Sequence, residues 1–218
     1  MEKRCYLFGS DQLPDGLQPL GRDQLQEIGS WPGEVPLLFK ILCSVDTRLC
    51  PSVLFHPCQD QALLADFAQG LAELKRFLQK IRHPQLQSDI RQTLELLQQP
   101  DWQYRYLVLE TSEIFSHGAK TKVWQNMQLC QQLRQLAGEM TLTLQQLQLP
   151  QSWHNQVKKP GLLARLLGVP ARPWQPDQQQ LIRSLGFSGW TTHKAGGPNK
   201  LDAATPSQPD LAGSGQLC

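Results

Sequence analysis

The chain has 218 residues, a formal net charge of +2 and 40% hydrophobic residues, which is enough apolar material for one good-sized domain with or without a tail. Residues 1–150 carry 14 Lys or Arg against 16 Asp or Glu, and residues 151–218 carry 7 against 3. Neither part has the strongly basic character that nucleic-acid binding usually shows, so we expect no nucleic-acid partner.

No targeting or membrane-spanning segment is expected. Residues 5–8 are the only apolar run before Gly9, whereas a signal peptide needs about 7–15 apolar residues and a membrane helix about 20. The six cysteines form no C-x-x-C pair, and without an export signal they are expected to stay reduced. These features predict a cytoplasmic protein that binds no membrane.

The first elements are a short strand and a loop. Residues 4–8 are aromatic and apolar, which predicts a strand that ends at Gly9. Residues 9–33 are interrupted by prolines and glycines and predict a loop, with one helical turn near residues 23–28.

Two helices are predicted next. Pro36 stands at a typical first helical position and an apolar run follows it, which predicts a largely buried helix to about Leu49. Asp60 is a candidate N-cap for the second helix. Apolar residues spaced by three and four then mark one helical face: Leu63, Leu64, Phe67, Leu71, Leu74, Phe77, Leu78 and Ile81.

The middle of the chain alternates between helix and strand. Residues 84–100 predict a helix bounded by two prolines, and residues 104–109 predict a strand. That strand is apolar on both faces at its end, so we place it in the centre of a sheet. A helix is predicted over residues 121–137, with Trp124 in the core. Residues 141–149 fit a strand and a helix equally well.

The texture changes after Pro150. We predict a single domain over residues 1–150 and a Pro-rich extension over residues 151–190, with short helices near 161–168 and 177–185. The remainder, 191–218, has almost no large apolar residue and is predicted to be a disordered tail. The predicted fold is α+β and mostly helical, with a small sheet covered by about four main helices.

Three residues near the predicted central strand are candidates for acid–base chemistry. Glu110, Glu113 and His117 lie at i, i+3 and i+7, and two carboxylates beside an imidazole suit proton transfer or metal binding. The alternative is that Glu113 caps a turn and that His117 is solvated. A di-metal helix pattern would need Glu-x-x-His, which is not the spacing here.

No other motif indicates a metal, a cofactor or a nucleophile. Cys50, His56 and Cys58 are close in sequence, but they lack the spacing and the fourth ligand of a structural zinc site. The patterns of phosphate loops, nucleophile elbows and zinc proteases are absent. We therefore expect neither a metal nor a cofactor.

Glutamine and tryptophan are the unusual components. The sequence has 30 glutamines, mostly in predicted helices, where they give an uncharged surface that is rich in hydrogen-bonding groups. Trp153, Trp174 and Trp190 lie in the Pro/Gly-rich part. They either anchor a protein partner or attach loops to the domain, and the sequence leaves both alternatives open.

Three segments resemble an uncharacterised bacterial family. Residues 4–8, Arg-Cys-Tyr-Leu-Phe, resemble its Arg-x-Tyr-Leu-Tyr opening. Residues 107–115 resemble its Leu-Leu-Glu-x-x-Glu-Ile-Phe stretch, and residues 34–50 fit its Pro-Leu-x-Phe-Lys-Ile-Leu core. The resemblance spans roughly residues 1–140, with departures at Cys5 and Phe8. The family is similar to small cytoplasmic proteins that accompany bacterial toxins, including immunity proteins.

The functional hypothesis is a binding protein that acts by occluding a protein partner, without catalysis. One alternative is an enzyme of unknown reaction that uses Glu110, Glu113 and His117. A second alternative is a scaffold subunit without activity of its own.

Overall fold

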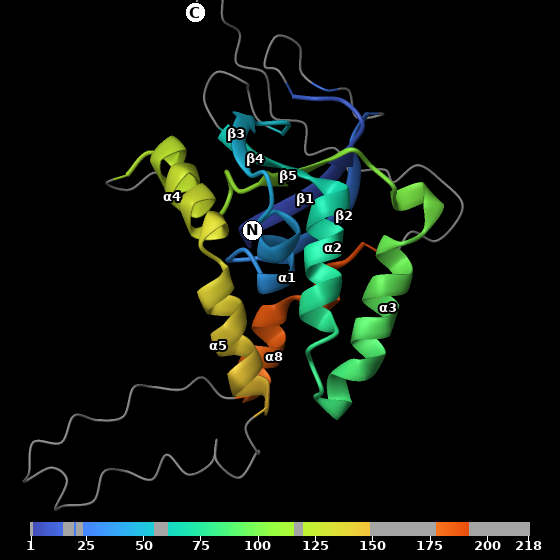
Figure 1. Cartoon of the computed structure of the whole chain (residues 1–218). Helices are drawn as coiled ribbons and strands as arrows, with labels where there is room; N and C mark the ends of the chain where they lie inside the picture. Colours follow the sequence, from blue (N-terminus) through green and yellow to red (C-terminus); the bar gives the residue numbers. More distant parts are fainter. Residues whose placement is uncertain are drawn as a thin grey trace, which may run out of the picture.

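The computed structural model describes residues 2–14, 20, 24–54, 61–115, 120–148 and 178–191. Within these residues, five antiparallel strands form one sheet in the order β2-β1-β5-β4-β3 (Figure 1). The strands are β1 (Arg4–Ser10), β2 (Gln26–Pro32), β3 (Arg48–Pro51), β4 (Gln61–Asp66) and β5 (Tyr106–Glu110). The α-helices are α1 (Leu37–Leu42), α2 (Phe67–Leu78), α3 (Gln87–Leu97), α4 (Lys122–Arg134), α5 (Ala137–Gln148) and α8 (Gln178–Leu185). This is the predicted α+β fold.

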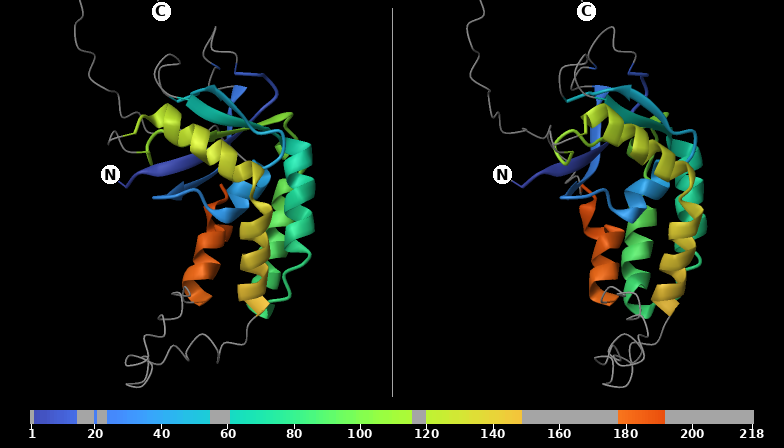
Figure 2. Two further views of the ribbon diagram at one scale, coloured as in Figure 1. Left: turned by 60° about the vertical axis from the view of Figure 1, so that its left-hand side comes forward. Right: turned by 90° about the vertical axis from the view of Figure 1, so that its left-hand side faces the viewer.

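The helices gather mainly on one side of the sheet. Figure 2 shows α2, α3, α5 and α8 extending away from the sheet roughly side by side, with α1 where they meet the strands. Short 3-10 turns, η2 (Pro84–Leu86), η3 (Pro100–Trp102) and η4 (Phe187–Gly189), complete the connections. Among the described residues, no helix is both long and apolar enough to cross a membrane.

β5 is the central strand, as the apolar run predicted. Its Leu109 is aligned with Leu7 of β1 on one side and with Leu63 of β4 on the other. Leu107 and Leu109 face the main core, whereas Val108 faces a smaller apolar cluster on the opposite side of the sheet. Both faces of β5 are therefore buried, which explains the absence of alternation in its sequence.

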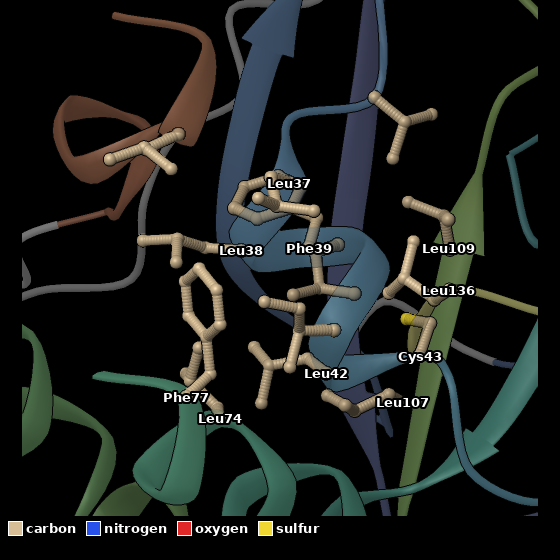
Figure 3. Close-up of a cluster of buried hydrophobic side chains, with 14 of the residues drawn as sticks. Leu37, Leu38, Phe39, Leu42, Cys43, Leu74, Phe77, Leu107, Leu109 and Leu136 are labelled. Carbon is tan, nitrogen blue, oxygen red and sulfur yellow. The ribbon is translucent and has the colours of Figure 1, made fainter. Parts of the chain in front are cut away.

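α1 forms the centre of the main core. Its side chains Leu37, Leu38, Phe39, Ile41 and Leu42 are all buried. Figure 3 shows the labelled side chains of α1 between those of α2 (Leu74 and Phe77) and those of β5 (Leu107 and Leu109). Only Lys40 reaches the surface, where it pairs with Glu139, and a helix that is apolar on its other faces has to be enclosed on them. The predicted burial of this segment is confirmed.

The predicted length of this first helix is wrong. α1 ends at Leu42 with Cys43 as its C-cap, and the chain turns before it enters β3 at Arg48. Asp46 adopts a left-handed backbone with a φ of 52°, which Asp tolerates better than most residues. The hydroxyl of Thr47 donates to the Cys43 carbonyl and closes the turn.

The second predicted helix is also partly replaced by a strand. Residues 61–66 form β4, and α2 begins only at Phe67, where the Asp66 side chain accepts a hydrogen bond from Gln69 N at 2.8 Å. The predicted helical face is right from there onward, and Leu74 is fully buried. Residues 61–66 are a short apolar run, and such a run fits a helix and a strand about equally well. Pairing with β5 made this one a strand.

β2 was predicted as a loop with a helical turn, and that prediction is wrong. Residues 26–32 pair with β1 along their length, with an irregularity between Leu7 and Phe8. The segment contains Gly29 and Ser30 and lacks the β-branched run that usually marks a strand. Its strand conformation comes from the neighbouring β1.

The later helices resolve one open alternative. Residues 141–149 fall mainly in α5, which ends at Gln148, and α8 contacts both α5 and α1. The possible helix over residues 161–168 and the tail from residue 192 lie outside the described residues. The predicted division into a domain, an extension and a tail stays a prediction.

Candidate functional site

Glu110 is buried at the end of β5, where only 1% of its surface is exposed. Its carboxylate accepts hydrogen bonds from Ser52 Oγ at 2.6 Å and Val53 N at 3.2 Å. It also accepts from Ser112 Oγ at 2.6 Å and Ser112 N at 3.3 Å. These four donors form a cage that joins the end of the central strand to the segment after β3.

Glu113 lies in the turn that follows β5 and binds different donors. Its carboxylate accepts from Arg4 N at 3.1 Å and from the Tyr6 hydroxyl at 3.3 Å. Tyr6 is paired with Glu110 in the β1–β5 register and binds Glu113 through its hydroxyl. Both acidic residues therefore lie at the same end of the sheet. Partial burial, followed by the nearby Glu113 carboxylate, raises the pKa of Tyr6.

The structure brings Glu110 and Glu113 to the same end of the sheet, but it gives each carboxylate its own donors. His117, the third candidate, lies outside the described residues, as do His56, Cys58, Trp153 and Trp174. Among the described residues, no group of three or more His, Cys, Asp or Glu side chains is arranged to hold a metal ion.

The four described cysteines are buried thiols. Burial raises the pKa of Cys5 and of Cys50 to about 12 and that of Cys43 further still. Because the thiolate is the reactive form, these three cysteines are poor nucleophiles at neutral pH. They fill space in the core.

A surface groove of about 320 Å³ lies between α4 and the segment 33–40, beside the turn that holds Glu113. Its apolar lining consists of Val35, Ile114, Phe115, Trp124 and Leu129. Its polar lining consists of Glu34, Lys40, Gln125, Gln128 and Gln132, together with Gly33. We call this feature the α4 groove.

Two large apolar side chains of α4 are exposed to solvent, and one of them, Trp124, lines the groove. Trp124 is 39% exposed and Met127 is 51% exposed. The Lys120 ammonium lies 3.8 Å from the centre of the Trp124 ring, within the range of a cation–π contact. The prediction that Trp124 belongs to the core is therefore wrong.

Asn126 explains why α4 is rotated in this way. It is fully buried, accepts a hydrogen bond from Thr111 Oγ1 at 2.7 Å and donates to the Gln61 carbonyl at 2.6 Å. These bonds direct the face with Leu129, Cys130 and Leu133 towards the sheet. Trp124 and Met127 are turned outward. Nothing in the sequence indicates that the polar Asn126 is buried. The orientation of α4, and with it the α4 groove, was therefore not predicted.

Trp190 is the one partner-binding candidate that the described residues include. Its ring packs on Phe39 with centres 5.1 Å apart, and it forms a β-bridge with Gly29 at the outer edge of β2. Its indole Nε1 is buried and has no hydrogen-bond acceptor among the described residues. Trp190 thus attaches its own segment to the domain, and partner binding by Trp153, Trp174 and Trp190 stays a prediction.

Comparison with known proteins gives one family. A family model described as a domain of unknown function, DUF7822, matches residues 12–150. No curated protein and no solved structure matches the chain. The matched region contains the whole α4 groove and the Glu110 cage, while the segment 178–191 follows it.

Proposed function

The chain belongs to the DUF7822 family of domains of unknown function. We propose that it is a protein-binding module that uses the α4 groove. The observation that carries the proposal is the exposure of Trp124, which lines that groove, together with the exposure of Met127 on the same helix. Exposed tryptophans next to an apolar depression are the residues that most often dominate binding energy at protein interfaces.

The lining of the groove fits a protein surface. Its lining combines five apolar side chains with three glutamines, whose amides both donate and accept hydrogen bonds. Lys40, the nearest cation in the lining, is paired with Glu139 at 3.0 Å. The partner that we propose presents an apolar side chain to the groove, with hydrogen-bonding groups around it that meet the glutamines and Glu34, as in the core and rim of a typical interface.

The state of the two carboxylates supports binding over catalysis. A general base has to reach the proton that it removes, but Glu110 is enclosed by four donors of the fold. Glu113 is held by the start of β1 through Arg4 N and Tyr6. In this proposal both residues shape the surface beside the α4 groove without reacting.

The finer proposal is an inhibitor of the immunity-protein kind, as the sequence resemblance implies. The partner would be a toxin-like bacterial protein in the same cytoplasm, bound without a cofactor. A tight complex would bury about 800 Å² of surface on each partner. In this proposal the buried surface extends from the groove over the neighbouring exposed face of α4.

Purification of a partner at native expression tests the proposal. The bait is the full chain in three forms: wild type, the double variant Trp124→Ala/Met127→Ala, and the control Gln79→Ala, which removes an exposed residue at the end of α2. We expect a stoichiometric partner with wild type and the control. We expect its loss, or binding weaker by about 2 kcal/mol or more, with the double variant.

Two results would count against this function. One is a partner that binds the double variant as tightly as wild type, which would move the interface away from α4. The other is the absence of any stoichiometric partner, combined with metabolite turnover that Glu110→Gln abolishes. Circular dichroism and thermal melting of each variant control for unfolding. Loss of the exposed Met127 should leave melting unchanged, whereas loss of Trp124 removes the cation–π contact with Lys120 and should lower the melting temperature only slightly.

A further inference from the structure

One face of α4 carries large apolar side chains between two cations. Lys120, Trp124, Met127, Gln131 and Arg134 follow one another at steps of four and three residues, which places them on the same side of a helix. All five residues are exposed. Lys120 stands just before the helix, but its ammonium lies over the Trp124 ring and so continues the row. We call these five residues the α4 stripe.

The α4 stripe and the α4 groove meet at Trp124, which belongs to both. Figure 1 shows α4 at the margin of the molecule, beside the sheet. The helix is held to the domain by a different face, which contains the buried residues Asn126, Leu129, Cys130 and Leu133. Packing of α4 on the domain therefore leaves the apolar part of the stripe exposed.

The charge on this part of the chain has one sign. No Asp or Glu occurs from residue 114 to residue 138, a stretch that contains Lys120, Lys122 and Arg134. The first turn of α4 has no acidic residue, although the positive end of a helix dipole favours Asp or Glu there. Two lysines at this end add to the positive field, so a negative group that approaches from outside would be attracted.

The two cations of the α4 stripe have neutral partners in the described part of the chain. Lys120 stacks on Trp124, and a guanidinium N–H of Arg134 donates to the Thr47 carbonyl at 3.0 Å. The ion pairs found among the described residues involve neither cation. Within this part of the structure, both positive charges therefore remain uncompensated.

Glu34 gives the site a direction. It is the acidic residue in the lining of the α4 groove, and it is exposed on the wall formed by segment 33–40, opposite α4. Acidic groups of a partner would be repelled at this wall and attracted along the stripe. The site therefore favours a partner whose carboxylates lie over α4.

We propose that the partner of the α4 groove is an acidic amphipathic segment of a protein. It places an apolar side chain against Trp124 and Met127, and carboxylates near Lys120 and Arg134. This inference rests on the proposed binding function of the groove and names the chemistry of the partner. Residues 120 and 134 lie about 21 Å apart along a helical row, so a segment of about four helical turns covers the stripe.

A protein segment fits this surface better than a membrane does. Gln125, Gln128 and Gln132 line the groove together with Trp124, and amides form directed hydrogen bonds with a peptide. Binding in the plane of a membrane depends instead on burial of a broad apolar face. The large apolar side chains that α4 exposes are Trp124 and Met127, which is too narrow a face for that mode.

Selection from random peptides tests the inference. The full chain is immobilised, and displayed random peptides of about 16 residues, enough for about four helical turns, are selected on it. Peptides that also bind the double variant Trp124→Ala/Met127→Ala are removed. We expect the remaining peptides to carry Asp or Glu on both sides of an apolar residue.

Calorimetry then measures the affinity of the best selected peptide. Lys120→Gln/Arg134→Gln is expected to weaken binding about threefold to tenfold at about 50 mM salt. The effect should shrink at about 300 mM salt, which screens exposed charges. The control Lys80→Gln/Arg91→Gln removes the same charge from exposed positions after α2 and in α3 and should leave the affinity unchanged. Glu34→Gln should tighten binding by up to about threefold.

The possible failures are distinguishable. Selected peptides that need Trp124 but are neutral or basic, or that bind Lys120→Gln/Arg134→Gln as tightly as wild type, would overturn this inference and leave the binding function of the groove intact. Absence of any peptide that distinguishes wild type from Trp124→Ala/Met127→Ala would contradict both. Equally tight binding of the chain to vesicles that contain phosphatidylserine would assign the stripe to a membrane and overturn the inference. Circular dichroism checks that each variant is folded.

Discussion

The carboxyl group of Glu110 is enclosed by hydrogen-bond donors from the described residues on both sides of it in the fold. Two serine hydroxyls and two backbone N–H groups surround its carboxylate. A buried charge is tolerated only when its hydrogen-bonding capacity is satisfied, so the cage makes the end of β5 depend on both adjoining segments.

Glu110→Gln is expected to lower the free energy of unfolding by about 1.5–3 kcal/mol, the range for hydrogen bonds to a charged group. Both carboxylate oxygens of Glu110 accept hydrogen bonds, whereas Gln has one accepting oxygen and a donating NH2 group. The NH2 group would therefore face donors on one side of the cage. Urea denaturation measures the loss. Glu113→Gln, at a half-buried site, serves as the control with a smaller effect. Equal stability of Glu110→Gln and wild type would mean that the carboxylate is not held as the cage implies.

Asn126 sets the rotation of α4, and this role is also testable. Asn126→Leu keeps the branched shape and the number of side-chain heavy atoms but leaves the Thr111 hydroxyl and the Gln61 carbonyl without this partner. We expect a loss of about 1–3 kcal/mol. Met127→Ala on the neighbouring exposed position should change stability by less than about 0.5 kcal/mol. The reverse order in denaturant melts would place Met127 in the core and Asn126 outside it.

At the scale of elements, the packing of α1 against α2 depends on the absence of a side chain. A Cβ at Gly70 would overlap the Leu42 carbonyl oxygen at the end of α1. In a helix interior, Gly is normally about 1 kcal/mol less favourable than Ala. The presence of Gly here is thus explained by the crossing of two helices that both contribute to the core.

Gly70→Ala is expected to destabilise the protein by about 1–3 kcal/mol, because overpacking exceeds the gain in helix propensity. Gly138→Ala in α5 is the matched control, since the added Cβ would meet no atom within 4 Å apart from its chain neighbours and the backbone of its own helix. It should stabilise the protein by about 0.5–1 kcal/mol. Thermal melting of the two variants in opposite directions supports the packing, whereas stabilisation by both would contradict it.

For the whole molecule, the buried thiols predict instability at alkaline pH. The pKa of Cys5 and Cys50 is about 12 in the folded protein, against 9.0 for a free thiol. Above pH 9 the unfolded chain loses protons that the folded chain keeps, so the free energy of unfolding falls as pH rises. The contribution is complete below pH 9 and is lost progressively towards pH 12.

Urea midpoints measured under reducing conditions at pH 8 and pH 10.5 check this expectation. The midpoint of wild type should fall between the two values. Cys50→Ala should show a smaller fall, because one of the raised thiols is removed. A Cys50→Ala slope equal to that of wild type would mean that Cys50 does not titrate with the raised pKa.

The sequence by itself determined those elements whose local pattern of apolar residues is typical of one kind of secondary structure. The helical face of α2 from Phe67 onward, the helix α3 between Pro84 and Pro100, and the doubly apolar strand β5 were all predictable. In the two helices the periodicity of apolar residues matches the helical period over several turns, and in β5 a short run that is apolar on both faces marks a buried central strand. The α+β class follows from these elements.

Tertiary contacts alone decided the rest. β2 is a strand because β1 and Trp190 pair with it, and β4 is a strand because β5 lies beside it. The α4 groove exists because buried Asn126 turns Trp124 outward. Such outcomes depend on partners distant in sequence, whose hydrogen bonds and burial outweigh local preferences of a few tenths of a kcal/mol per residue. No local pattern contains those partners, so the candidate site became visible only in the folded chain.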